Sequence, residues 1–542
     1  MPRDLFVKTH KQLCLAKHFT THPMIRFFLT AAAVAILGTT QAQCDCPPLS
    51  QRTDVTITDN GEGTGTTTWT CDNNYILNGY VFVNGGQALT IEAGTIVKGA
   101  AGSGVDAAAM IVSTGGQIFA EGTEDCPIIF TFEGDALDGS TSYNTRGQWG
   151  GLIVLGDATT NFGGPAQVEG IPTDNNQATY GGNNDEDNSG VLTYVSIRHG
   201  GIQLAAANEI NGLTLAGVGS GTTIHHVEVV SNLDDGIEFF GGAVTVDQAL
   251  VAFCGDDSFD WDQGFHGGGS QWLAVQDQPT GEGNRGGELD GDDSETSNVS
   301  ADEMPFATPT IEGWTVVGVG GQQGLLFRHG SGGHVSNGLL CNTSEGIEIE
   351  DSTDEVEDAY DRFLAGDLTL SNIVVTGGVD ALDYDGDAAD GDDVLDAYAN
   401  ENGVLSGEIE GLDDMFAFDP SGTFAIDLLN VEVGQGSGHA WTAGWTFCAQ
   451  RGLFTTVTSV NDVITQDPLN VSVYPNPSFG LGHLVLPEYG MYNVQVFSSA
   501  GALVSKHPNQ TQRTTLPVLE AGTYLIVVDG NGETSTLKWM VR

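Results

Sequence analysis

The chain has 542 residues and a formal net charge of −55, with 76 glycines, 17 prolines and 8 cysteines. This length allows two or three domains with a large core, and the lack of a Gly-X-Y period excludes collagen. Residues 43–468 hold 67 acidic residues against 8 basic ones, so nucleic acid and anionic lipid headgroups are excluded as partners. Such a surface suits cations, or serves solubility alone.

Residues 1–42 have the pattern of a secretory signal peptide. A charged region ends at Arg26, an apolar run covers 27–37, and Thr-Gln-Ala at 40–42 provides a small-residue cleavage site. Met24 is an alternative start of the natural chain. The apolar run is too short to span a bilayer and no later run is long enough, so we expect no transmembrane anchor after processing.

From residue 75 onward the sequence consists of short β-runs separated by glycine. These runs are rich in β-branched and aromatic residues and lie at 80–83, 89–91, 110–112, 128–130 and 152–154. No helix-period segments alternate with them, which argues against a doubly wound sheet. Consecutive short strands joined by turns predict an all-β chain folded as a parallel β-helix, whose turns stack about 4.8 Å apart.

A repeat of 22 residues predicts the register of this solenoid. The segment 234–239 (DDGIEF) aligns with 256–261 (DDSFDW), and the strand-like runs before them align as well. Variants of the phrase recur at 201–204, 324–327, 346–349 and 381–384. A fixed period in the twenties with inserted loops is typical of a solenoid. We therefore predict that Ile237 and Phe259 are neighbours on adjacent turns, with both side chains in the core.

Several segments resemble a family of secreted bacterial right-handed β-helices. They are LTIEAGT at 89–95, AEGT at 120–123, CPIIFT at 126–131, QWGGL at 148–152 and GVGSGT at 217–222. The resemblance covers residues 75–455 and implies a right-handed, pectin-lyase-like solenoid, preceded by an N-terminal cap at 43–74. Because its motifs are specific for the fold, it implies no catalytic residue.

The composition changes at the C-terminal end, where 456–467 is a predicted linker. Short alternating strands in 468–542 predict a small Ig-like β-sandwich. The opening YPNP at 474–477, AGTYL at 521–525 and the basic end resemble the type IX secretion sorting domain. This resemblance implies the type IX secretion machinery as a partner. It also implies export to the outer-membrane surface or the extracellular space of a Gram-negative bacterium.

The cysteines show no paired CxxC arrangement, so a zinc site is not expected. Cys254 and Cys341 lie at least two turns apart, about 10 Å or more, which exceeds the Cα separation of about 7 Å that a disulfide allows. We predict that these two do not pair. Cys44 or Cys46 with Cys71 is the candidate disulfide at the N-terminal cap.

Stacked carboxylates form the main candidate site. In the 22-residue register Asp235 lies over Asp257 and Glu238 over Asp260, with about 5 Å between turns. Like charges this close destabilise a fold unless cations or hydrogen bonds intervene, and hard oxygen ligands favour Ca²⁺. The alternative is that these acids face solvent or accept hydrogen bonds from turn amides.

An enzyme is the alternative function. The acids at 256–257 and the Gly-Phe-His-Gly at 264–267 resemble those of β-helical polygalacturonases, but no arginine has a lysine two places on, as that family requires. A calcium-dependent polysaccharide lyase would instead use Arg198 or Arg328 as its base. The alternative catalytic set is therefore Asp256, Asp257, His266 and Arg198.

Aromatic side chains offer a second way to hold a sugar. The tryptophans that could stack on sugars are Trp149, Trp272, Trp314 and Trp441, although a buried position in the core is the preferred interpretation of each. The sequence favours a cell-surface or secreted binding protein, glycan-binding or adhesive, with cation-stabilised acidic turns. A polysaccharide lyase or glycoside hydrolase is the alternative, and a structural surface-layer role is a third.

Overall fold

The computed structural model describes most of residues 44–451 and much of residues 469–541. The gaps in the first range are 163, 173–175, 205–209, 278–284, 293–303, 320, 322, 353–357, 387, 389, 408–416, 420–422 and 426–439. The predicted signal peptide at 1–42 and the predicted linker at 456–467 lie outside the described residues. No helix in the described part of the chain combines the length and the apolar character needed to cross a bilayer.

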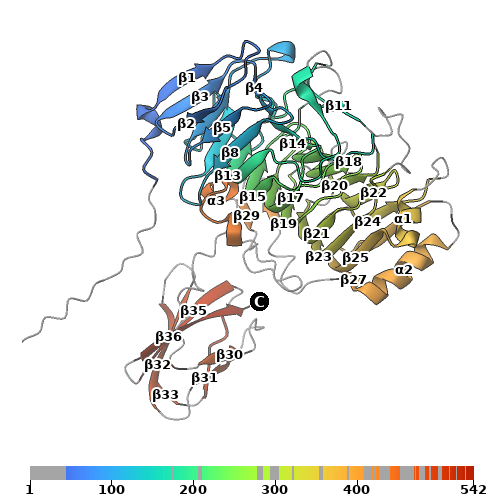
Figure 1. Ribbon diagram of the computed structural model, residues 1–542. Coiled ribbons are helices and arrows are strands. Elements are labelled where there is room, and N and C mark those ends of the chain that lie inside the picture. The colour runs from blue at the N-terminus through green and yellow to red at the C-terminus, as the bar shows by residue number, and fades with distance from the viewer. Residues whose placement is uncertain are drawn as a thin grey trace, which may run out of the picture. The chain divides into compact units, whose positions relative to one another are not determined.

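Two long parallel sheets, which we call sheet A and sheet B, form a β-helix (Figure 1). Sheet A has 15 strands, of which β2, β5 and β8 form a branch that joins the others at β13. In order across the sheet the others are β1 (Thr53–Ile57), β3 (Asn73–Leu77), β6 (Ile96–Gly99), β9 (Ile128–Phe132), β13 (Gly190–Arg198), β15 (Thr223–Val230), β17 (Thr245–Ala252), β19 (Gly268–Val275), β21 (Thr310–Val317), β23 (Gly333–Cys341), β25 (Leu368–Val375) and β27 (Val404–Ser406). The branch holds β2 (Thr67–Trp69), β5 (Ala88–Ile91) and β8 (Gln117–Glu121).

Sheet B has 10 strands, and its order follows the chain from one end to the other. They are β4 (Tyr80–Val83), β7 (Ala109–Val112), β10 (Leu152–Leu155), β14 (Leu213–Ala216), β16 (Ile237–Phe240), β18 (Phe259–Asp262), β20 (Arg285–Asp290), β22 (Gln323–Arg328), β24 (Glu345–Glu350) and β26 (Leu382–Asp385). This is the predicted pectin-lyase-like solenoid. Its first strand, β1, already lies within the predicted cap at 43–74.

Most long strands of sheet A bend at one residue in the left-handed region. These residues have φ between 50° and 60° and are missing from the register pairs of their strands: Tyr194, His226, Gln248, Gln271, Asn337 and Asn372. Because non-glycine residues rarely adopt positive φ, the recurrence on successive turns marks a structural corner. Each strand of this kind therefore supplies two faces of the solenoid.

The core confirms the predicted 22-residue register. Ile237 pairs with Phe259 across β16 and β18, and both side chains are fully buried. The ring of Phe259 stacks on that of Trp272, with centroids 4.4 Å apart. Trp149, Trp272 and Trp314 are fully buried, as expected for core positions, and Trp441 is half-buried.

Two features of the chain differ from the sequence-based expectation. The copy at 201–204 forms no strand. The strand that pairs with β16 is β14, in which Leu213 lies opposite Ile237, an offset of 24 residues instead of 22. Helices also occur: α1 (Ala359–Ala365), α2 (Gly391–Asn402) and α3 (Phe447–Gln450). The helix α2 buries Leu395 and Ala399 one turn apart on one face.

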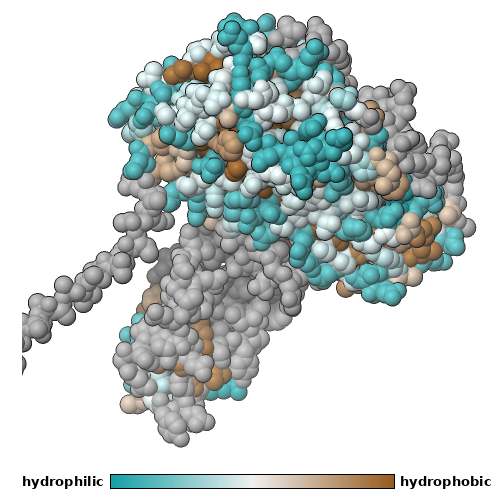
Figure 2. Space-filling view, viewed as in Figure 1, coloured by the Kyte–Doolittle hydropathy of each residue, from teal (hydrophilic) through white to brown (hydrophobic). Residues whose placement is uncertain are grey.

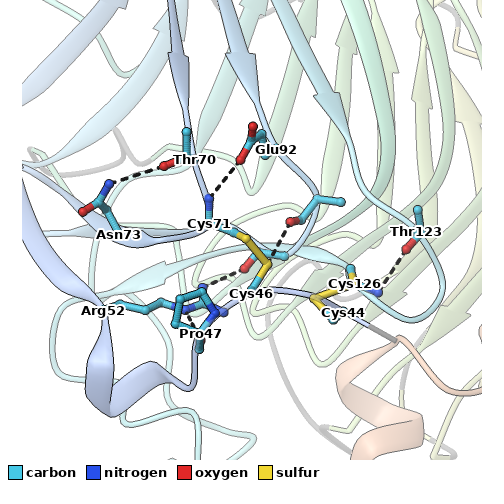
Figure 3. Close-up of a disulfide and its surroundings, with 12 residues drawn as sticks. Cys44, Cys46, Pro47, Arg52, Thr70, Cys71, Asn73, Glu92, Thr123 and Cys126 are labelled. Carbon is cyan, nitrogen blue, oxygen red and sulfur yellow. Dashed lines mark hydrogen bonds between the residues drawn. A yellow bond between two sulfur atoms is a disulfide. The ribbon is translucent and has the colours of Figure 1, made fainter. Parts of the chain in front are cut away.

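Two disulfides close the N-terminal end (Figure 3). Cys46 pairs with Cys71, one of the two predicted candidates, and Cys44 pairs with Cys126, which was not predicted. The Arg52 side chain donates hydrogen bonds to the carbonyl oxygens of Pro47 and Gly94, at 2.9 and 2.8 Å, which tie the same segment to the solenoid. Cys254 and Cys341 form no disulfide with each other, as predicted, and both are buried.

A short segment that we call the strap, residues 440–451, packs on the outer side of sheet A beside β13 and β15 (Figure 1). The backbone N–H groups of Phe447 and Cys448 donate hydrogen bonds to the buried Glu228 carboxylate, at 2.8 and 3.3 Å. Phe447 and Cys448 also join an apolar cluster with Leu250 and other outward-facing residues of sheet A. The strap is thus part of the folded solenoid.

The remaining elements are small. The insertion after β10 contains the hairpin β11 (Ala166–Gln167) and β12 (Thr179–Tyr180) and the 3-10 helix η3 (Asn176–Ala178). Other short pieces are η1 (Leu49–Gln51), η2 (Gly104–Asp106), β28 (Ala417–Asp419), β29 (Thr423–Ala425) and η4 (Ala440–Thr442). On the face shown in Figure 2, hydrophilic residues cover much of the described surface and the hydrophobic patches are small.

The C-terminal region forms two antiparallel sheets of its own. One contains β30 (Ser472–Tyr474), β31 (His483–Val485) and β34 (Arg513–Thr515), and the other contains β32 (Tyr492–Ser498), β33 (Leu503–Gln510), β35 (Gly522–Gly530) and β36 (Glu533–Val541). Its core includes the fully buried Trp539.

Candidate metal centre

The outward side chains of sheet B place carboxylates in columns. Ile237 and Phe239 point into the core, and because side chains alternate along a strand, Glu238 points outward. The same position holds Asp260 on β18 and Glu288 on β20, and the three residues are register neighbours. The sequence pattern that builds the core therefore also builds this column.

The carboxylate oxygens of this column lie close to those of the turns before each strand. Asp235, Glu238 and Asp260 each offer an oxygen within 4.8 Å of the others, and Asp257, Asp260 and Glu288 do the same. A third group consists of Asp234, Asp235 and Asp256. The structure thus brings together the four residues predicted as metal ligands and adds Glu288 to them, while calcium binding itself stays a prediction.

Backbone and amide groups satisfy part of this negative charge. The N–H of Asp257 donates a hydrogen bond to Oδ1 of Asp235 at 2.9 Å, and Arg285 N–H donates to Asp257. The Asn211 side-chain amide donates to Glu238. These are the turn-amide contacts that the alternative interpretation of the acids expects, and they leave other carboxylate oxygens available.

Burial makes the remaining charge costly. Three of the four predicted ligands are nearly inaccessible to solvent: Asp235 is 8% exposed, Glu238 7% and Asp257 1%. Burial first, and repulsion from neighbouring carboxylates second, raise the pKa of all three and of Asp260 well above the ordinary value. A bound cation would offset both effects by supplying the missing positive charge.

Two arginines neutralise one end of the cluster. Arg285 lies 3.4 Å from Asp257 and 3.0 Å from Glu288, and Arg328 contacts Glu288 at 2.5 Å and Asp290 at 2.8 Å. In the part of the chain that the structure describes, no ion pair reaches Asp235, Glu238 or Asp260. That end offers only hard oxygen donors, which fit Ca²⁺.

The alternative catalytic residues are distributed over the molecule. Asp256 and Asp257 precede β18, whereas His266 follows it and lies 3.6 Å from Asp185. Arg198 ends β13 on sheet A, where it donates to Ser196 at 2.7 Å and is buried beside the strap. The structure therefore brings neither His266 nor Arg198 into contact with the paired acids, and it places Arg328 within the acidic cluster.

Sequence reasoning missed Glu288, Arg285 and Asp290. Glu288 follows Asp260 by 28 residues, because the turn between them is longer than the repeat of 22. The repeated phrase is also altered, since Gly287 occupies the inward position that Phe259 fills on the previous turn. A Cβ at Gly287 would lie 2.8 Å from the Trp314 ring, so that ring fills the space of the missing side chain. The one remaining sign of the repeat in this segment was Glu288 itself, an acidic residue between Gly287 and Leu289.

Comparison with known proteins supports the two-part organisation. The pectate-lyase-like β-helix domain matches residues 61–446, and the secretion system C-terminal sorting domain matches residues 472–542. The sorting domain implies handling by the type IX secretion system and a cell-surface or secreted location.

Other similarities are weak. The crystal structure of the enzymatically active domain of bacteriophage CBA120 tailspike protein 2 aligns with a TM-score of 0.20 and 11% identity, over 86% of this chain and 66% of that chain. This chain thus spans just under two thirds of that domain. No similar protein was found among curated proteins. Because the match at residues 61–446 covers well over half of the sequence, the chain belongs to the pectate-lyase-like β-helix family and carries a C-terminal secretion sorting domain.

Proposed function

We propose that this protein is a surface or released binding protein for glycans, which it holds on the acidic outer face of sheet B with the help of Ca²⁺. The observation that carries the proposal is the cluster of Asp235, Glu238, Asp257 and Asp260, whose carboxylates are close, largely buried and only partly neutralised. Export through the sorting domain gives the protein access to extracellular polysaccharide.

Calcium would supply two things at this face. It would offset the repulsion between stacked carboxylates, which otherwise weakens the fold. It also accepts oxygen ligands from outside the protein, since Ca²⁺ takes six to eight of them. Sugar hydroxyl and carboxylate groups are such ligands, so an acidic face that repels anions could still bind a uronic-acid polymer.

A polysaccharide lyase is the second candidate, because Arg285 and Arg328 stand among the acids of the same face. An arginine base needs a lowered pKa. Burial alone would lower the pKa of both arginines, but the carboxylates of Asp257 and Glu288 at Arg285, and of Asp290 and Glu288 at Arg328, outweigh it and raise both. This supports binding over lyase chemistry.

A glycan array tests the proposal. The full chain should bind one class of acidic polysaccharide in Ca²⁺ and lose it in EDTA, and Asp257→Asn with Asp260→Asn should abolish it. The matched control, Asp396→Asn with Glu401→Gln, removes two exposed charges from α2 and should bind normally. Analysis of any bound polysaccharide for unsaturated or newly reducing ends then separates binding from catalysis. Binding that is equal in EDTA would contradict the proposal.

A further inference from the structure

A second candidate site lies near the other end of sheet B. A cavity of about 380 Å³ opens between the first turns of the solenoid and the insertion after β10. This volume is within the range of about 300–1,000 Å³ typical of small-molecule sites. Its wall contains two glycines and six amide or hydroxyl residues: Asn84, Ser113, Thr114, Asn176, Gln177 and Thr179. None of its lining residues carries an ionisable side chain, although the surrounding domain is strongly acidic.

Hydrogen bonds fix the walls of this cavity. The Asp59 carboxylate accepts from the N–H groups of Gly61 at 2.7 Å and Phe82 at 3.0 Å, which holds the loop that carries Gly61. Across the cavity, the Gln177 amide donates to Asn84, and the Thr114 hydroxyl donates to the carbonyl oxygen of Thr179 at 2.7 Å. The insertion is therefore tied to the stacked turns that follow β4 and β7, and the cavity is a formed feature.

Ser113 is the second observation that points to a ligand. It lines the cavity and is 5% exposed, and its hydroxyl has no hydrogen-bond partner among the residues that the structure describes. A buried polar group without a partner is destabilising. Its oxygen has almost no exposed surface, so a ligand hydroxyl would meet it only once the side chain turns towards the cavity, where a serine hydroxyl both donates and accepts.

We infer that this cavity binds an uncharged hexose unit of a glycan. Amide and hydroxyl side chains donate and accept hydrogen bonds, as sugar hydroxyls do. Among the described residues, the lining provides no arginine or lysine to pair with a uronate and no carboxylate to pair with an amino sugar. Four strand steps, about 19 Å, separate β7 from β18 along the axis. The cavity is therefore separate from the metal centre. The inference rests on the proposed glycan binding and adds a neutral subsite to it.

The test uses the full chain and four probes: D-glucose, D-galactose, D-mannose and D-galacturonate. Saturation-transfer NMR and titration should show at least one neutral hexose binding with a Kd of about 1–10 mM, in Ca²⁺ and in EDTA alike, and no binding of galacturonate in EDTA. Ser113→Ala should weaken binding about fivefold, the equivalent of one hydrogen bond. Asn176→Ala with Gln177→Ala should weaken it about tenfold or more.

Two controls keep the outcomes distinct. Asn78→Ala removes an exposed amide at the turn after β3, and Asp257→Asn with Asp260→Asn alters the metal centre; both should bind hexose as the unaltered chain does. The inference is overturned if no neutral hexose binds, if galacturonate binds best in EDTA, or if the cavity variants keep full affinity with unchanged melting temperatures. Glycan-array binding that persists in the cavity variants would leave the proposed function standing. A glycan array that shows no binding at all would contradict both the proposed function and this inference.

Discussion

Glu238 on β16 and Asp260 on β18 are register partners, and their carboxylates share one group with Asp235 outside the hydrophobic core. Burial and mutual repulsion raise the pKa of both, so their ionised forms oppose folding at neutral pH. The core partners Ile237 and Phe259 fix this spacing, and the acids cannot separate without disturbing the core. A cation bound between these carboxylates would offset the cost of their ionised forms.

Calcium should therefore stabilise the fold specifically. At a Ca²⁺ concentration about 100 times its Kd, binding to the native state alone would contribute about 2.7 kcal/mol. We expect millimolar Ca²⁺ to raise the melting temperature more than NaCl of matched ionic strength does, and Asp257→Asn with Asp260→Asn to remove that difference. Thermal unfolding followed by circular dichroism measures it.

The control for this experiment is Asp396→Asn with Glu401→Gln, which removes the same formal charge from an exposed helix face. It should keep the calcium-specific increase. If both salts shift the melting temperature equally, these acids hold no specific calcium ion and any ion acts on them only by screening.

Glu348 gives a pH-dependent test on the same sheet. Burial, and then the neighbouring Glu345, raise its pKa to about 7. A carboxyl whose folded pKa is raised costs stability in full above that pKa; the cost shrinks as the pH falls through it and vanishes only below the unfolded pKa of 4.5. Glu348→Gln should therefore raise the melting temperature at pH 8, by about 1–3 °C, raise it less at pH 5.5, and have little effect at about pH 4. A similar shift at both pH values, as expected for the exposed control Glu401→Gln, would refute this cause.

The strap depends on Glu228. Its buried carboxylate accepts hydrogen bonds from Phe447 N–H, Cys448 N–H and the Ser196 hydroxyl. Glu228→Ala removes the carboxylate that these donors and the neighbouring Arg198 face. We expect it to lower the free energy of unfolding by roughly 3–5 kcal/mol. We expect the buried Cys448 to become reactive towards iodoacetamide at temperatures where the rest of the chain stays folded, which peptide mapping detects. Glu312→Ala, at an exposed position of β21, should leave Cys448 protected.

The disulfides should stabilise the N-terminal end. Cys46–Cys71 closes a sequence separation of 25 residues, and such links typically contribute about 2–4 kcal/mol. Cys46→Ser with Cys71→Ser should lower the melting temperature under oxidising conditions. In the unaltered chain, a reducing agent should produce at least as large a decrease. No decrease in either experiment would mean that other contacts, such as those of Arg52, suffice to hold this end.

The sequence was most informative where turns have equal length. The 22-residue offset placed Ile237 beside Phe259 and Glu238 beside Asp260, because one turn of constant length preserves both the register and the inward or outward direction of each side chain. The offset from Asp260 to Glu288 was hidden by a longer turn and by Gly287. The local pattern therefore predicted which residues form strands, whereas the pairing of those strands depended on the length of each turn.

Contacts made by distant segments could not be read from local pattern. The strap meets Glu228 from more than 200 positions away in the sequence, and Cys44 meets Cys126 across 82. The cavity beside Ser113 needs the insertion after β10, whose return to the first turns has no periodic signature. The helix α2 was not predicted either, because its apolar residues are few and lie among many acidic ones.

The central claim is that the acids of sheet B form a calcium site, and isothermal titration of CaCl₂ into the EDTA-stripped full chain tests it most directly. The account predicts saturable binding with a Kd below about 1 mM, which the Asp257→Asn, Asp260→Asn variant loses and the Asp396→Asn, Glu401→Gln variant keeps. Weak, unsaturable heats that are the same for all three proteins would contradict it.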